Sequence, residues 1–277
     1  MKAEIIVLAG QSNAVGVGHV RYLPRHFSAE RLERFEKGYE NILINYYSHD
    51  IKSNGFVKTA YGCTEKSKNT FGPEVGMADA LNLRYPQKTV FIVKCAFGGT
   101  DIVNNWASPS RGEIYDPLSF AEGDTQDEHY RNPGWCYNEL IKTVKESLSI
   151  LESQGYDPQI KAFCWMQGES DALDEKNAVP YIDRYEMLLN DFDTNFGEYM
   201  SGCVYVDAGI SECWQHYEEI NRQKQQHAEK TENSFYIDTI GCGLATTNEP
   251  EREVDWAHYD SDSTIRLGEL FAENIKL

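Results

Sequence analysis

Short apolar runs recur along the chain, and several of them are continuous rather than alternating between apolar and polar positions. The runs with strand-like length and many β-branched residues are Ile5–Leu8, Ile42–Tyr46, Val90–Cys95, Ile160–Trp165, Val204–Val206 and Phe235–Ile237. A short continuous apolar run is typical of a strand that is buried on both faces. The pattern therefore predicts a sheet that is covered by helices on both sides.

Apolar residues at helical spacing lie between these runs. The stripes cover Pro73–Leu81, Leu140–Leu151, Tyr181–Phe192 and Ile265–Phe271. The first of them begins with a proline, which is favourable in the first turn of a helix. Strands that alternate with helices predict an α/β fold in which the central sheet is parallel.

One long segment departs from this alternation. Residues Asn104–Gly134 are polar, contain three prolines and have little periodicity. A loop this long within a compact domain usually has a functional role. We therefore expect a single domain over residues 1–277, with a polar loop or lid around residues 104–134 beside the functional site.

Composition and charge narrow the classes of function. The 277 residues are 41% hydrophobic and 25% charged, which is ordinary for a globular protein. The net charge of −18 repels nucleic acid and anionic lipid, and no apolar run approaches the ~20 residues of a membrane span. We therefore expect no nucleic-acid or membrane partner, while the oligomeric state stays open.

The N-terminus and the cysteines indicate a reducing compartment. Met1–Glu4 leads directly into the first apolar run, without the features of a signal peptide, so we expect a cytoplasmic protein. The seven cysteines are scattered without a C-x-x-C pair, which favours free thiols over disulfides. Asp124–His129 is interpreted as a solvated acidic loop, and we expect neither a metal nor a cofactor.

Polar segments follow three of the predicted strands, and a fourth precedes the last helix. These segments are Gly10–Asn13, Ala96–Asp101, Met166–Asp171 and Asp255–His258. Ligands of doubly wound sheets bind beyond the carboxyl ends of the strands. We therefore expect the four segments to meet at one edge of the sheet.

Together these segments supply the groups for acyl transfer from a serine. Ser12 is the candidate nucleophile, and His258 is the candidate base that takes its proton. Asp255, three residues before His258, can hold the other ring nitrogen and stabilise the imidazolium. There is no G-x-S-x-G motif, which argues against a standard α/β-hydrolase.

An oxyanion intermediate needs two or three fixed hydrogen-bond donors. The candidates are the N–H of Ser12, a glycine N–H at Gly98 or Gly99, and the side-chain amide of Gln167. Each residue by itself also has an ordinary interpretation, such as a turn, a helix cap or a solvated charge. The combination of four complementary motifs favours the catalytic interpretation.

With these motifs the chain resembles a known group, the SGNH-type esterases. Within them it is most similar to sialate O-acetylesterase-like and family 6 carbohydrate acetylesterase domains. The matching stretches are GQSNAVG, FGPEVGMA, KCAFGGTDI, WMQGESDA and DWAHYDSDSTIRLGELFA. They run in the order of the family from residue 5 to about residue 272, so the resemblance covers almost the whole chain.

The resemblance implies a three-layer α/β/α sandwich with a parallel sheet of about five strands. It implies a serine esterase that removes acetyl groups from sugars without a cofactor. Ser12, Asp255 and His258 match the triad, and Gly99 matches the backbone oxyanion donor better than Gly98. Gln167 stands where the wider superfamily has an asparagine.

Other residues of these motifs are expected to bind substrate or to organise the site. They are Gln11, Asn13, Gly98, Glu169 and Trp106. Glu169 is a candidate second partner of the histidine, and Trp106 is a candidate stacking surface for a sugar, although a tryptophan lies in the core more often. The expected substrates are acetylated xylo-oligosaccharides, sialic acid or related sugars.

Two alternatives to this function stay open. An SGNH esterase or thioesterase could act on a non-carbohydrate acyl group, which would require a wide apolar channel. A catalytically silent protein on the same scaffold could bind sugar without hydrolysing an ester. The intact Ser12, Asp255 and His258 argue against the silent alternative.

Overall fold

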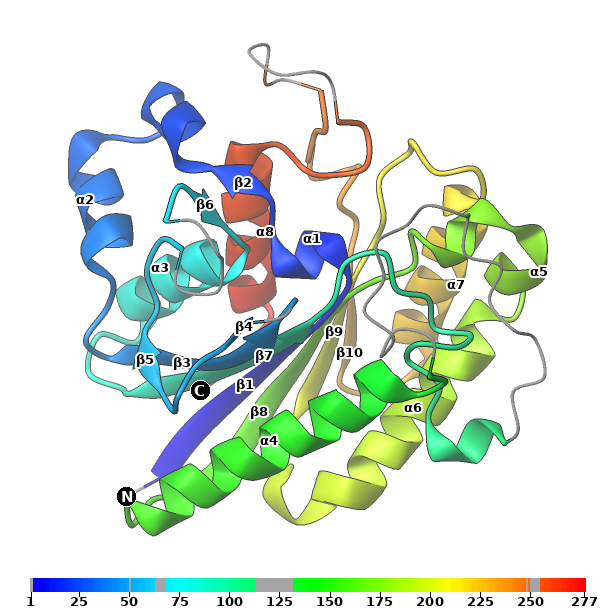
Figure 1. The fold of residues 1–277 in the computed structure, drawn as a ribbon, viewed down its shortest axis with the longest axis horizontal. Coiled ribbons are helices and arrows are strands. Elements are labelled where there is room, and N and C mark those ends of the chain that lie inside the picture. The colour runs from blue at the N-terminus through cyan, green and yellow to red at the C-terminus, as the bar shows by residue number, and fades with distance from the viewer. Residues whose placement is uncertain (1, 50, 63–67, 113–131, 248, 250–254) are drawn as a thin grey trace.

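A computed structural model of the chain describes residues 2–49, 51–62, 68–112, 132–247, 249 and 255–277 (Figure 1). Its main sheet has the strand order β10-β9-β8-β1-β7-β3-β4, and β5 pairs with β3. Six of these strands are parallel: β1 (Lys2–Gly10), β3 (Ile42–Ser48), β7 (Val90–Ala96), β8 (Asp157–Met166), β9 (Val204–Ala208) and β10 (Ser234–Ile237). All six apolar runs lie in these strands, which confirms the prediction of a parallel α/β sheet. The parallel part has six strands, where the resemblance implied about five.

The remaining strands were not predicted. β4 (Ile51–Lys52) and β5 (Val57–Lys58) pair antiparallel with β3, while β2 (Gly18–His19) and β6 (Thr70–Phe71) form a separate two-stranded ribbon. Each has two residues, which is too short for an alternating pattern to appear in the sequence.

Helices cover both faces of the sheet (Figure 1). On one side lie α3 (Glu74–Arg84), α8 (Ser261–Glu273) and, outside them, α2 (Ala29–Lys37); on the other lie α4 (Trp135–Ser153), α6 (Tyr181–Phe196) and α7 (Tyr217–Lys230). The short helices are α1 (Ser12–Val15) and α5 (Glu175–Ala178), and the 3-10 turns are η1 (Val20–Arg25), η2 (Pro109–Arg111), η4 (Asp171–Leu173) and η5 (Gly197–Tyr199). The four predicted stripes lie in α3, α4, α6 and α8.

Two longer helices, α2 and α7, were missed by the sequence analysis. The only buried residue of α2 is Phe35, and those of α7 are Ile220, Gln223 and Lys224. A helix that buries so few apolar side chains has no continuous apolar stripe, so its periodicity is weak.

The register of the sheet brings three strand ends to the same level. Gly10 at the end of β1 pairs with Ala96 of β7 on one side and with Met166 of β8 on the other. β3 ends there too, since Ser48 also pairs with Ala96. The segments that come after these strands therefore begin side by side, as expected for a ligand site of a doubly wound sheet.

The start of the predicted lid is part of the packed interior. Asn104, Asn105 and Ser108 are all at most 5% exposed, and the backbone N–H of Asn104 donates to the Asp101 carboxylate over 2.6 Å. Further along, the Ser110 hydroxyl and backbone N–H donate to Asp191 of α6. The prediction of a rim or lid is therefore wrong for residues 104–108, because they are packed inside the protein. Residues 113–131, including Asp124–His129, lie outside the described part.

The described cysteines agree with the prediction of free thiols. Cys95, Cys136, Cys164 and Cys203 are buried and Cys213 and Cys242 are exposed, all six of them free of disulfides, while Cys63 lies outside the described residues. Within the described chain, no helix has both the length and the apolar content that crossing a membrane requires.

Candidate active site

Gly10 allows the first strand to turn sharply into Ser12. It has φ of 143°, and a Cβ atom there would lie 1.9 Å from the carbonyl oxygen of Met166. The next backbone N–H, that of Gln11, donates to the same carbonyl over 2.9 Å. Ser12 then begins the short helix α1 at the sheet edge. The first amides of a helix have no partner within the helix, so this turn presents N–H groups beside the Ser12 side chain.

His258 and Asp255 form the pair expected from their spacing. The His258 Nδ1 atom lies 2.7 Å from Asp255 Oδ2, and the two side chains are 23% and 32% exposed. The other carboxylate oxygen of Asp255 accepts the backbone N–H of Ala257 over 3.1 Å. A proton on Nδ1 that is shared with the carboxylate leaves Nε2 as the basic nitrogen.

Asn13 connects the nucleophile segment to the histidine segment. Its side chain is 3% exposed. The Asn13 Oδ1 atom accepts the backbone N–H of Tyr259 over 3.0 Å, and Nδ2 donates to the carbonyl of Ala257 over 3.2 Å. These two residues lie on either side of His258 in the sequence. The residue next to Ser12 therefore holds the backbone that carries the candidate base.

Glu169 contacts Asn13 within the interior. It is fully buried, and its Oε1 atom accepts from Asn13 Nδ2 over 2.8 Å. Its Oε2 atom has no hydrogen-bond partner among the described residues. Burial raises the pKa of the Glu169 carboxyl, and the hydrogen bond from Asn13 opposes that rise. The hydrogen bond found for Glu169 thus goes to Asn13, whereas Nδ1 of His258 is bonded to Asp255.

Gln11 organises the loop that comes after β8. Its side-chain oxygen accepts from Gln167 Nε2 and from the backbone N–H of Ser170, each over 3.2 Å, and lies 3.4 Å from the N–H of Gly168. The side chain is 2% exposed. These contacts make Gln11 an internal support rather than a residue that faces a substrate.

The prediction of Gln167 as an oxyanion donor is wrong. Its Nε2 atom lies 2.6 Å from Asp171 Oδ2, 3.1 Å from the Thr100 carbonyl oxygen and 3.2 Å from Gln11 Oε1. An amide nitrogen has only two hydrogens, so three protein acceptors leave none for an oxyanion. Gln167 instead connects the segments after β1, β7 and β8.

The two glycines after β7 differ in their surroundings. A Cβ atom on Gly98 would lie 3.6 Å from Ser12 Cβ, so Gly98 packs directly against the candidate nucleophile. A Cβ atom on Gly99 would have no heavy atom within 4 Å, but its φ of 70° favours glycine. The pair forms a turn that runs beside Ser12, and Gly98 is its nearer member.

His49 lies at the same place and was missed by the sequence analysis. Its ring would lie 3.1 Å from a Cβ atom on Gly98, and it has a positive φ of 51°. Non-glycine residues in this conformation are uncommon and cluster at functional sites. His49 directly follows β3, so a search of the residue just beyond each predicted strand could have found it.

The prediction of Trp106 as a sugar platform is also wrong. Trp106 is fully buried, its indole N–H donates to Thr100 Oγ1 over 2.8 Å, and its ring packs edge-on against Trp165 with 4.9 Å between centroids. A ring that is enclosed in this way has no face for a sugar.

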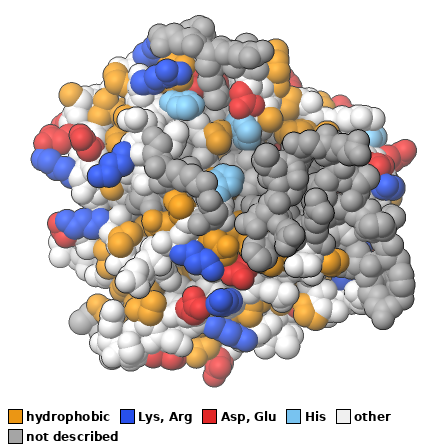
Figure 2. All heavy atoms as spheres, viewed as in Figure 1, with side chains coloured by type: hydrophobic (Ala, Val, Ile, Leu, Met, Phe, Trp, Pro, Cys, Tyr) orange, Lys and Arg blue, Asp and Glu red, His pale blue; other side chains and the backbone are white. Residues whose placement is uncertain are grey.

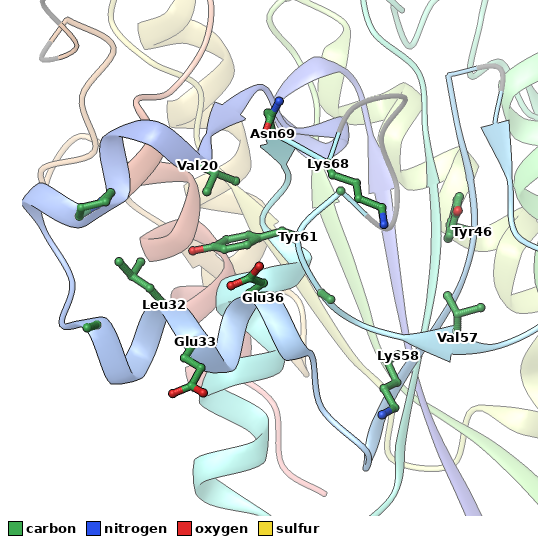
Figure 3. Close-up of a pocket in the computed structure, with 14 residues that line it drawn as sticks. Val20, Leu32, Glu33, Glu36, Tyr46, Val57, Lys58, Tyr61, Lys68 and Asn69 are labelled. Atoms are coloured by element: carbon green, nitrogen blue, oxygen red, sulfur yellow. The ribbon is translucent and has the colours of Figure 1, made fainter.

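A second hollow lies away from these residues. Figure 3 shows a groove of about 1090 Å³ near α2, β3 and β5, with Tyr61 and Glu36 pointing toward it. None of the four motif segments lines it. On the face drawn in Figure 2, acidic and basic side chains are interspersed despite the net charge of −18. Neither feature changes the location of the candidate site.

Comparisons with known proteins agree with the geometry. A family model described as "Carbohydrate esterase, sialic acid-specific acetylesterase" matches residues 2–276. No curated protein matches the chain by sequence.

Solved structures share the fold at low sequence identity. An Arabidopsis thaliana protein is 20% identical, with a TM-score of 0.66, over 98% of this chain and 96% of its own. A structure described as NanS is 15% identical, with a TM-score of 0.69, over 98% and 96%. A carbohydrate acetylesterase from Xanthomonas citri is 12% identical, with a TM-score of 0.61, over 99% of this chain and 55% of its own.

Proposed function

Because the chain belongs to the sialic acid-specific acetylesterase family of carbohydrate esterases, we propose that Ser12 removes acetyl groups from sugar hydroxyls through an acyl-enzyme. Family membership makes the protein a carboxylic ester hydrolase that acts on carbohydrates. The observation that carries the serine mechanism is the 2.7 Å contact between His258 Nδ1 and Asp255, on a backbone that is bonded to the residue next to Ser12.

The proposed reaction has two steps. The Ser12 oxygen attacks the acetyl carbonyl while Nε2 of His258 takes the hydroxyl proton, and that proton then passes to the departing sugar oxygen. A water molecule attacks the acetyl-serine, gives its proton to His258 and releases acetate, after which Ser12 recovers its proton. Asp255 orients the ring and stabilises the imidazolium that forms in both steps.

Backbone N–H groups are the proposed oxyanion donors. The N–H of Ser12 and one from the Gly98–Gly99 turn are well placed for this role, because the turn packs against Ser12. Loss of one such donor typically costs ~3 kcal/mol of barrier. We further propose that His49, which lies against Gly98, contacts the sugar or the acetyl group. In this proposal the region forms one catalytic domain, since the motif segments meet at one sheet edge.

The test is acetate release from a panel of substrates. The panel contains acetylated xylo-oligosaccharides, O-acetylated sialic acid, simple sugar acetates, and acetyl and octanoyl esters of p-nitrophenol. Ser12→Ala should lower kcat by about 10³-fold or more while the fold persists. Ser201→Ala changes an exposed serine just before β9, at the amino ends of the parallel strands, and is the matched control that should retain full activity.

Each outcome has a clear meaning. Release by the wild type and by Ser201→Ala, but not by Ser12→Ala, would support the serine mechanism and name the preferred sugar. Equal activity of Ser12→Ala would overturn it. A strong preference for the octanoyl ester would favour another acyl group, and sugar binding without any hydrolysis would favour a silent binding protein.

A further inference from the structure

The hydrogen bonds of Asn13 carry an inference that rests on the proposed function and deepens it. We propose that Asn13 is a positioning residue that sets the placement of His258 relative to Ser12, and that Glu169 sets the orientation of the Asn13 side-chain amide. In this arrangement Asn13 is a clamp rather than a group that touches the substrate.

The clamp grips the histidine segment at two points. The Asn13 Oδ1 atom accepts from Tyr259 N–H over 3.0 Å, and Asn13 Nδ2 donates to the Ala257 carbonyl over 3.2 Å. The contacts flank His258, so they restrain both the position and the tilt of its backbone. Because Asn13 follows Ser12 directly in helix α1, the nucleophile and the base share one rigid connection. A misplacement of about 1 Å between reacting groups can cost about 10²-fold in rate.

Glu169 selects one of the two orientations of the amide. A carboxylate can only accept hydrogen bonds, so its Oε1 atom, 2.8 Å away, requires the nitrogen of Asn13 rather than the oxygen. The reverse orientation would set the Asn13 oxygen against both the carboxylate and the Ala257 carbonyl. It would also lose the Tyr259 N–H bond. Since Glu169 is fully buried, bulk water does not compete for this role.

The same contacts argue against two other roles. Asn13 is 3% exposed and both its amide oxygen and its nitrogen are bonded to protein, so it has little left for a sugar hydroxyl. His258 Nδ1 is bonded to Asp255, so Glu169 is not needed to orient the ring directly. The effect of Glu169 on the base is therefore expected to pass through Asn13.

The central variant is Asn13→Asp. It retains an oxygen for Tyr259 N–H but loses the donor, and it brings two carboxylates together in the interior. We expect kcat on the acetylated sugar that the panel identifies, or on p-nitrophenyl acetate, to fall about 10²-fold with KM within about twofold. The rate at which a small fluorophosphonate labels Ser12 should fall in parallel, because labelling needs the serine and the histidine aligned but no sugar.

The double variant Asn13→Asp/Glu169→Gln separates positioning from simple damage. The glutamine can donate to the new aspartate and so restores the buried pair, although not the bond to Ala257. We expect it to recover about tenfold of the lost kcat. Asn190→Asp makes the same change at an exposed site on α6 and should leave kcat unchanged.

Three results would overturn the clamp. One is unchanged kcat and labelling in Asn13→Asp; another is a rise in KM with constant kcat, which would indicate substrate binding. The third is a kcat that follows thermal stability across the series without recovery in the double variant. If Asn13→Asp does not fold, Glu169→Ala takes its place, and wild-type kcat in that variant would contradict the proposal. Residual activity of Ser12→Ala would instead contradict the proposed mechanism, so the two failures are distinguishable.

Discussion

Among single residues, Gly10 has the tightest surroundings near the candidate nucleophile. Its positive φ and its approach to the Met166 carbonyl allow β1 to end at the sheet edge and α1 to begin two residues later. No side chain fits there without moving the backbone of β8. The placement of Ser12 therefore depends on the absence of a Cβ atom two positions earlier.

This dependence predicts a large effect for Gly10→Ala. The new Cβ would lie 1.9 Å from a main-chain oxygen, so the free energy of unfolding should fall by about 4 kcal/mol or more. Gly155→Ala is the matched control, since it also has a positive φ, of 81°, but open space around it, and it should cost only about 1–2 kcal/mol. Urea unfolding of the three proteins measures the difference. Similar losses in both variants would show that strain in φ, rather than the close approach, limits Gly10.

Among the elements, a buried ion pair supports the short helix α1. Lys94 of β7 and Glu74 of α3 are both fully buried, with 2.7 Å between Nζ and Oε2. Lys94 Nζ also donates to the Val15 carbonyl at the end of α1 over 2.6 Å, and Glu74 Oε1 accepts the Gly72 N–H over 3.1 Å. The pair thus joins β7, α3 and the helix that carries Ser12.

Removing one member of this pair should be worse than removing both. Lys94→Met leaves a buried carboxylate without its cation, which typically costs about 3–5 kcal/mol. Lys94→Met/Glu74→Gln removes the isolated charge and should recover at least half of that loss. Thermal and urea unfolding of both variants test this expectation, and additive losses in a double-mutant cycle would contradict it.

At the scale of the whole molecule, buried carboxyls couple the folded state to pH. Asp171, in the turn after β8, is fully buried and accepts the backbone N–H of Ile102 over 2.9 Å. Burial raises the pKa of Asp171, and the neighbouring Asp101 carboxylate raises it further, while the hydrogen bond from Gln167 opposes the shift. A carboxyl with a raised folded pKa stabilises the fold below its unfolded pKa of about 3.9. That contribution is lost as pH rises through the folded pKa.

Asp171→Asn should therefore change the pH dependence of stability. The asparagine keeps an acceptor for Gln167 and Ile102 but cannot ionise. We expect Tm of the variant to gain on that of the wild type as pH increases from about 5 to about 8. Asp157→Asn, at an exposed residue at the start of β8, is the control and should show no such trend. A constant difference in Tm between Asp171→Asn and wild type over this range would contradict the assignment of the shift to Asp171.

The fold was largely predictable because its signals are local. Six buried strands and four amphipathic helices each leave a pattern within a few residues, and the helices that were missed bury few apolar side chains. The site segments were predictable for a related reason, since polar residues that directly follow buried strands have few positions to occupy other than the sheet edge. The pairing of Asp255 with His258 needed only their spacing of three residues. Their catalytic roles, and that of Ser12, stay predictions.

The roles of Gln167, Trp106 and Asn13 depended instead on distant contacts. Nothing in the sequence near Gln167 indicates that three acceptors from three segments surround its amide, and nothing near Trp106 indicates that Thr100 and Trp165 enclose it. Asn13 meets Tyr259 across 246 positions of sequence.

The sequence by itself determined the order of strands and helices, the family and the residues that could take part in chemistry, because these depend on local patterns and short motifs. Only the tertiary structure decided which of those residues face a substrate and which support the others. That choice depends on burial and on hydrogen-bond partners, which are set when the ends of β1, β3, β7 and β8 come together.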